Sequence, residues 1–284
     1  MGNVGIDMSL ENILFSFGLT LLAGLSTGIG GLITVFSKRT NTKFLSVILG
    51  FSAGVMIYIS FMEMLPEANL ILTQNLGQHR GLWSALAAFF GGVIFIAIID
   101  NVIPSESNPH ESHKVEEIEE TGRNVCGINN STSNEKLLRT GLFTALVIAI
   151  HNFPEGLAAF TSAFSQASLG IVIAVAIAIH NIPEGMAVSI PIYCVTGSKK
   201  KAFLYALFSG LAEPLGAILG FFILSSFLND IVLGILFAVV AGIMVYISFD
   251  ELLPSAEEYG QHHLAILGLM GGMALMAVSL ILFA

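Results

Sequence analysis

The chain has few charged side chains and only two cysteines. Charged residues make up 11% of its 284 residues, hydrophobic residues make up 55%, and the mean hydropathy is +0.83. This composition is typical of an integral membrane protein and excludes an ordinary soluble globular domain. Cys126 and Cys194 are too few for a thiolate metal site. We also expect no disulfide, because the topology places both cysteines on the reducing, cytoplasmic side.

Apolar runs of about 17 to 25 residues are long enough to cross a lipid bilayer as helices. The sequence contains eight such runs, and no lysine or arginine falls within any of them. We therefore predict a single all-α transmembrane domain over residues 1–284. The polar, acidic segment 104–139 is predicted to be a disordered cytoplasmic loop. The expected spans are 12–35, 44–66, 82–103, 140–162, 169–193, 202–226, 231–254 and 264–283.

The basic residues predict the orientation of these spans. Ten of the eleven lysines and arginines fall between spans 1 and 2, 3 and 4, or 5 and 6, and only Arg80 falls on the opposite side. Basic residues accumulate in short cytoplasmic loops, so both termini are expected outside the cytoplasm. The formal net charge is −9, and seven of the acids fall in the 104–139 loop. This balance does not indicate a nucleic-acid partner.

The sequence contains an internal repeat. Residues 53–68 match residues 241–256 at eleven of sixteen positions, and Gly24 and Gly92 have weaker counterparts in Gly210 and Gly272. The two copies lie five crossings apart, so they run in opposite directions. We predict a 3+2+3 arrangement, in which helices 1–3 and 6–8 are inverted repeats around the central helices 4 and 5. Inverted repeats with a site near the midplane are typical of secondary transporters.

The central pair carries a duplicated motif, HNFPEG at 151–156 and HNIPEG at 180–185. A charged side chain at the centre of a membrane helix costs roughly 2.5 to 3.5 kcal/mol on insertion scales, so such residues mark ion or proton paths. At about 100° per residue, the His, Asn and Glu of one copy share a helix face. Glu213, in the sixth span, adds a third carboxylate. The candidate metal ligands are His151, Asn152, Glu155, His180, Asn181, Glu184 and Glu213.

This ligand set has nitrogen and oxygen donors but no sulfur. Such a set suits zinc, iron(II), manganese or cobalt better than copper(I). The carboxylates have no cationic side chain to pair with inside the spans, so protons or bound cations must compensate them. An alternative is that the histidines and glutamates are neutral partners in interhelical hydrogen bonds.

The doubled HNxPEG motif and the eight spans resemble the Zrt/Irt-like protein (ZIP) family of metal transporters, in its bacterial ZupT/GufA-like branch. The resemblance implies a transporter without a resident cofactor, in the bacterial inner membrane, which imports Zn²⁺ and other divalent ions such as Fe²⁺, Mn²⁺, Co²⁺ or Cd²⁺. It also implies elevator-like or rocking access and a homodimer. By resemblance, the first metal position uses His151, Glu155, His180 and Glu184, and the second uses Asn152, Glu155, Asn181, Glu184 and Glu213. Some members differ at the positions of His180 and Asn181, so their cation preference does not transfer.

Further acids and histidines lie outside this motif. Glu63, Asp100, Asp250 and Glu251 fall near helix ends, where they are candidates for a cation pathway or a gate. Acids in the interface without such a role are an equally good interpretation, because water is close there. His110 and His113 in the acidic loop are candidates for capture of released metal.

Two other functions fit part of this pattern. A zinc-dependent intramembrane hydrolase would use His and Glu, but the HExxH pattern needs a Glu beside the first His, where this chain has Asn152. A proton-coupled carrier of an organic solute would use the glutamates and leave the matched His and Asn pairs unexplained. We therefore expect a transporter and not an enzyme.

Overall fold

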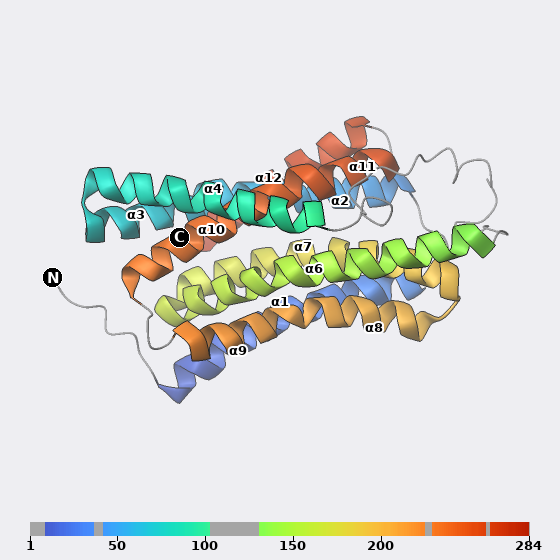
Figure 1. The fold of residues 1–284 in the computed structure, drawn as a ribbon, viewed down its shortest axis with the longest axis horizontal. Helices are drawn as coiled ribbons and strands as arrows, with labels where there is room; N and C mark the ends of the chain where they lie inside the picture. The colour runs from blue at the N-terminus through green and yellow to red at the C-terminus, as the bar shows by residue number, and fades with distance from the viewer. Residues whose placement is uncertain (1–8, 37–41, 103–130, 225–228, 260–261, 284) are drawn as a thin grey trace.

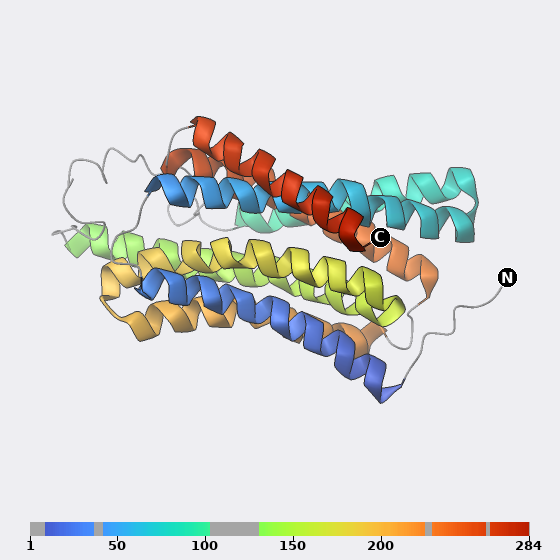
Figure 2. The ribbon, with the colours of Figure 1, turned by 180° about the vertical axis from the view of Figure 1, so that it is seen from behind.

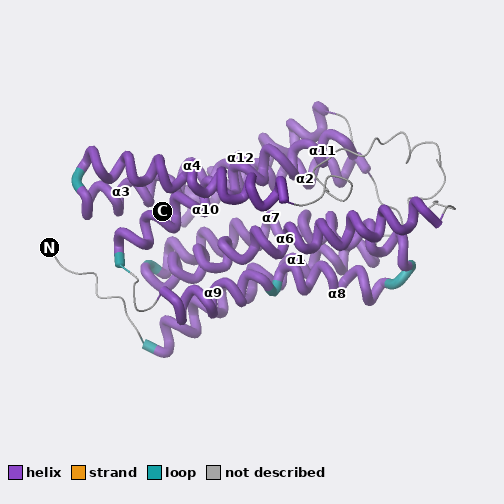
Figure 3. The backbone as a smooth tube through the Cα atoms, viewed as in Figure 1, coloured by secondary structure: helices purple, strands orange, loops and turns teal. Residues whose placement is uncertain are grey.

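The computed structural model describes residues 9–36, 42–102, 131–224, 229–259 and 262–283, and all its elements are helical (Figures 1 and 3). Apolar side chains dominate these helices, as the composition predicted. The elements are α1 (Leu10–Phe36), α2 (Thr42–Ile59), η1 (Ser60–Met64), α3 (Leu65–Leu76), α4 (Gln78–Val102), α6 (Ser131–Ser165), α7 (Ala167–Thr196), α8 (Lys199–Gly210), α9 (Ala212–Leu224), α10 (Asp230–Ile247), η3 (Ser248–Leu252), α11 (Leu253–Tyr259) and α12 (His262–Phe283).

Seven segments of the described chain are long and apolar enough to cross a membrane. They are Leu10–Phe36, Lys43–Leu76, Gln78–Asp100, Ala167–Thr196, Lys199–Phe222, Asp230–Glu257 and His262–Leu282. α6, with 35 residues, is the longest single helix but is not among the seven, and polar residues fill its first turns. The described chain is therefore a helical membrane protein.

The helix boundaries differ from those expected at several places. The second helix continues through η1 and α3 to Leu76, well beyond position 66, and Gly77 (φ 82°) makes the turn into α4. α6 begins at Ser131, so the last part of the expected 104–139 loop is helical, whereas 103–130 lie outside the described residues. The sixth span divides at Leu211 into α8 and α9, close to Pro214, which cannot donate a helical hydrogen bond.

The helices form two bundles that lie side by side (Figures 1 and 2). In one bundle, α1 packs on α7 and α8, and α6 packs on α7 and α9. In the other, α2 packs on α12, and α10 packs on α3 and α4. α7 contacts α2, and α6 contacts α10, so the helices that carry the duplicated motif lie at the border between the bundles.

The two copies of the predicted repeat have the same local structure. Each passes into one π-helical turn at the same repeat position, Ser60–Met64 in one copy and Ser248–Leu252 in the other. In each, the hydroxyl of the first serine donates to the backbone oxygen of the methionine four residues earlier, at 2.7 Å. A π-helical turn widens the helix and is frequent at functional sites. Here it contains Glu63 in one copy and Glu251 in the other.

Matched glycines set the packing within the second bundle. A Cβ added to Gly54 would lie 2.0 Å from the backbone oxygen of Leu269, and one added to Gly242 would lie 2.0 Å from that of Phe89. Both glycines therefore let two backbones touch, α2 on α12 and α10 on α4, as small residues do in membrane helix pairs. Because Gly54 and Gly242 are repeat counterparts, the repeat extends from sequence into helix packing.

The expectation of free thiols is wrong for Cys194, which is disulfide-bonded. Cys194 lies near the end of α7, and α7 packs along α6. The other cysteine, Cys126, lies outside the described residues but comes only a few residues before α6 in the sequence. The sequence argument considered only the redox compartment.

Candidate metal centre

The two HNxPEG copies lie in the middle of α6 and α7, and both helices continue through Pro154 and Pro183. All six His, Asn and Glu side chains of the motifs are buried, and none is more than 1% exposed. Glu213, in the first turn of α9, is also fully buried. The structure therefore brings the seven predicted ligands into the protein interior and turns none of them toward lipid.

The histidines and glutamates pair reciprocally between the two helices. His151 Nε2 lies 3.3 Å from Glu184 Oε2, and His180 Nε2 lies 3.3 Å from Glu155 Oε2. Each imidazole therefore meets the carboxylate of the other motif copy. Helical spacing placed His and Glu of one copy on a common face, and the packing of α6 against α7 turns the two faces toward each other.

The asparagines connect the motif helices to the rest of the first bundle. The side-chain amide of Asn152 donates to the backbone oxygen of Ser209 at 3.3 Å, and that of Asn181 donates to the backbone oxygen of Ala23 at 3.1 Å. Asn181 also donates to Glu213 Oε1. Asn181 therefore joins the third carboxylate to the duplicated motif.

The last glycine of each motif allows this assembly to close. A Cβ on Gly156 would lie 2.1 Å from the backbone oxygen of Glu213, and a Cβ on Gly185 would lie 1.8 Å from that of Thr27. Any larger residue would separate α6 from α9, or α7 from α1. The sequence contains these glycines, but only the packing shows that Gly156 lets Glu213 approach the motif and that Gly185 does the same for Thr27.

Polar atoms without a partner concentrate at this locus. Twelve buried side-chain nitrogen or oxygen atoms of the described residues lack a hydrogen-bond partner, and nine of them belong to the seven predicted ligands. Two of these nine, His151 Nε2 and Glu184 Oε2, have only their 3.3 Å contact with each other. Unsatisfied buried polar groups are rare in folded proteins and call for an explanation such as an ion. Free imidazole nitrogens, carboxylate oxygens and amide oxygens are together the donors that a divalent transition metal accepts.

The ligands are nevertheless arranged as separate pairs. Within the described parts of the chain, no group of three or more His, Cys, Asp or Glu side chains is close enough to hold a metal ion. A cation with four or more ligands would therefore require the two His–Glu pairs to open toward each other. The donor types fit a transition metal, whereas their present spacing favours His–Glu pairing.

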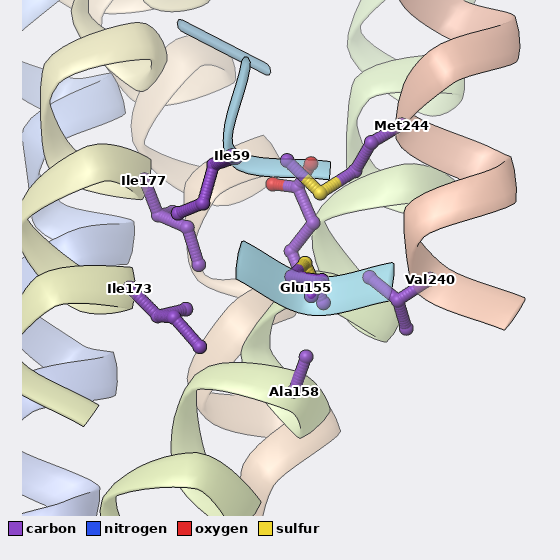
Figure 4. Close-up of a pocket in the computed structure, with 8 residues that line it drawn as sticks. Ile59, Glu155, Ala158, Ile173, Ile177, Val240 and Met244 are labelled. Atoms are coloured by element: carbon purple, nitrogen blue, oxygen red, sulfur yellow. The ribbon is translucent and has the colours of Figure 1, made fainter. Parts of the chain in front are cut away.

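A narrow apolar pocket lies beside Glu155 at the border between the bundles (Figure 4). Glu155 is its only ionisable lining residue, and the other residues come from both bundles. The pocket thus connects one of the predicted ligands to the surface along which the two bundles meet. Its lining consists of Ile59, Met64, Glu155, Ala158, Ile173, Ile177, Val240 and Met244.

The four predicted pathway acids differ in their surroundings. Asp100 and Asp250 both form a hydrogen bond with the hydroxyl of Tyr246, a residue that sequence reasoning did not select. Glu251 is 6% exposed and lies close enough to His151 to interact with it electrostatically. Its repeat counterpart, Glu63, is only half-buried. The loop histidines, His110 and His113, lie outside the described residues.

Comparison with known proteins identifies the class of molecule. A family model described as ZIP Zinc transporter matches residues 10–280. The chain is 58% identical over 273 residues to the zinc transporter ZupT of Streptococcus mutans serotype c, covering 96% of this chain and 99% of that protein. It is 56% identical over 279 residues to ZupT of Clostridium perfringens, covering 97% and 98%, and 57% identical over 273 residues to ZupT of Chlorobaculum parvum, covering 96% and 99%.

A buried ligand set inside a helical membrane protein, together with these matches, defines a membrane transporter for divalent metal cations. The chain belongs to the ZIP family. The resemblance seen in the sequence is thereby confirmed, and so is the expectation that the chain is a transporter and not an enzyme. The intramembrane hydrolase and the carrier of an organic solute are both wrong.

Proposed function

We propose that this transporter imports zinc into the cytoplasm through a two-cation site between α6, α7 and α9. The observation that carries the proposal is the concentration of unpartnered donor atoms on seven buried side chains, with two reciprocal His–Glu pairs at the centre. The relatives at 54–58% identity are named zinc transporters. Iron(II), manganese, cobalt and cadmium are further candidates, because the same donor set accepts them.

The first position uses His151 and Glu184 with His180 and Glu155, which already face each other as pairs. The second uses Asn152 and Asn181 with Glu213, and it shares Glu155 and Glu184 with the first. Entry of a cation replaces each His–Glu contact by contacts to the ion. The dehydrated ion is thus compensated by the carboxylates that the opened His–Glu contacts make available.

The helices follow the 3+2+3 scheme, with α6 as the eighth crossing. One repeat consists of α1, the helix over 42–76 that contains η1, and α4. The other repeat consists of α8 with α9, the helix over 230–259, and α12. The motif helices α6 and α7 lie between the two repeats. Movement of the bundle that holds the site against the other bundle would expose the site to one side of the membrane at a time, as in other transporters built from inverted repeats.

The orientation follows the basic residues, with both termini outside the cytoplasm in the bacterial inner membrane. Glu251 is then the first acid on the cytoplasmic side of the site, followed by Asp250 and Asp100, and Glu63 lies on the outer side. His110 and His113 would collect released metal. The functional unit is a homodimer.

The test is uptake into liposomes that contain the purified protein and a metal-sensitive dye. Wild-type protein should carry zinc, and the dye should report each of the other cations under the same conditions. The double variant Glu155→Gln/Glu184→Gln keeps the side-chain shapes but removes two charges, and uptake should fall to the level of empty liposomes. Wild-type transport retained by that variant, at equal protein insertion, would refute the site. Wild-type protein that moves none of these cations would refute the function.

A further inference from the structure

Thr27 occupies the position in α1 that Glu213 occupies in the sixth helix. The backbone of Thr27 packs against Gly185, the last residue of one motif, and the backbone of Glu213 packs against Gly156, the last residue of the other. Gly24 and Gly210 pack against each other where α1 and α8 cross. The two residues are therefore related by the internal symmetry, and one of them is neutral where the other is a carboxylic acid.

The asparagine contacts obey the same relation. Asn181 donates to the backbone oxygen of Ala23, four residues before Thr27, and Asn152 donates to that of Ser209, four residues before Glu213. The Thr27 side chain packs against Gly210, next to the Ser209 oxygen that Asn152 contacts. Thr27 and Asn152 therefore both lie against the backbone at Ser209 and Gly210, whereas Glu213 accepts a hydrogen bond from Asn181 directly.

The hydroxyl of Thr27 is buried and has no partner. The side chain is 0% exposed, and Oγ1 accepts and donates no hydrogen bond. Threonines in membrane helices usually donate to the backbone oxygen four residues earlier, as Thr20 and Thr34 of the same helix do, to Ser16 and Gly30. For Thr27 that oxygen belongs to Ala23, and Asn181 already donates to it.

We propose that Thr27 gives its hydroxyl oxygen to the transported cation on the Asn152 side of the site, opposite Glu213. The inference rests on the proposed transport function and adds an eighth side chain to the proposed cation site. In this arrangement, Thr27 and Asn152 supply two neutral oxygens on one side of the site. Glu213 and Asn181 lie on the other side. A carboxylate at both positions would hold a divalent ion more tightly and slow its release.

The test compares Thr27→Val, which keeps the branched shape and removes the hydroxyl, with Thr27→Ser, which keeps the hydroxyl. Thr20→Val is the matched control, because it makes the same change in the same helix at a 0% exposed side chain whose hydroxyl is satisfied locally. Zinc binding to purified protein is measured by calorimetry, and zinc uptake is measured in liposomes. Thr27→Val should lower affinity and uptake by about two- to tenfold, the usual range for one lost polar contact.

Thr27→Ser should retain most of the wild-type values, and Thr20→Val should match the wild type. Equal zinc binding by Thr27→Val and the wild type would overturn the role of Thr27 while leaving the transport function intact. An equal loss in Thr27→Ser would also overturn it, because packing and not the hydroxyl would then be responsible. Wild-type protein that fails to carry zinc would refute the proposed function, and the calorimetric comparison would still decide on Thr27.

Discussion

Substituting Gly156 by Ala should damage the proposed metal site without replacing any of its candidate ligands. A Cβ at this position would lie 2.1 Å from the backbone oxygen of Glu213, whereas ordinary contact begins at 3.4 Å. α6 and α9 must therefore separate by about 1 Å or more, and the atom in the way is backbone, so no side chain can rotate to relieve the clash. Such overpacking destabilises a protein by about 1–3 kcal/mol.

The same displacement moves Glu213 away from Asn181 and the motif residues. Binding sites require their groups within about 0.5 Å of the productive geometry, so we expect zinc uptake in liposomes to fall by about tenfold or more. Thermal unfolding in detergent should show the loss of stability. Gly91→Ala in α4 is the matched control, because a Cβ there would meet nothing within 4 Å. Alanine is also the better helix former, so this control should retain stability and uptake. Normal uptake by Gly156→Ala, or equal losses in both variants, would refute the packing argument.

Two further pairs of variants test the contacts around the site. Asn181 donates to a carboxylate and Asn152 only to a backbone oxygen, so zinc affinity measured by calorimetry should fall roughly tenfold further in Asn181→Ala than in Asn152→Ala. Equal losses would mean that the bond to Glu213 does not organise the site. Tyr246→Phe removes the hydroxyl that bonds Asp100 and Asp250, and it should slow zinc uptake by about two- to tenfold while zinc affinity stays unchanged. Its repeat counterpart gives the control, Tyr58→Phe; a slowing of the same size in both would remove Tyr246 from the pathway.

The members of the proposed site could be selected from the sequence because their chemistry is costly inside a membrane. Seven side chains that water would normally solvate fall within apolar runs. The two HNxPEG copies also have identical spacing, which a chance occurrence does not explain. The sequence could not predict which histidine meets which glutamate, because both arrangements satisfy helical spacing. Only the packing of α6 against α7 selects the pairs His151–Glu184 and His180–Glu155.

Helix positions were predictable to the extent that apolar length determines them. The extension to Leu76 was missed because α3 is more polar than the apolar run before it, and hydropathy alone ends the span there. The break at Leu211 had a visible signal in Pro214, but its consequence, Glu213 placed in a first helical turn beside Asn181, depends on long-range packing. The only sequence signal for Thr27 was its repeat position opposite Glu213, since a threonine in a membrane helix normally satisfies itself.

The position of Glu155 connects the chemistry of the site to movement of the bundles. Of the seven ligands it is the one that lines the apolar pocket, whose walls include Ile59 and Val240 from one bundle and Ile173 from the other (Figure 4). Its Oε2 contacts His180 while Oε1 has no partner. A shift between the bundles would therefore open the pocket at this carboxylate before it reached the other ligands. Glu155 is therefore the candidate ligand through which movement between the bundles would act on the proposed site.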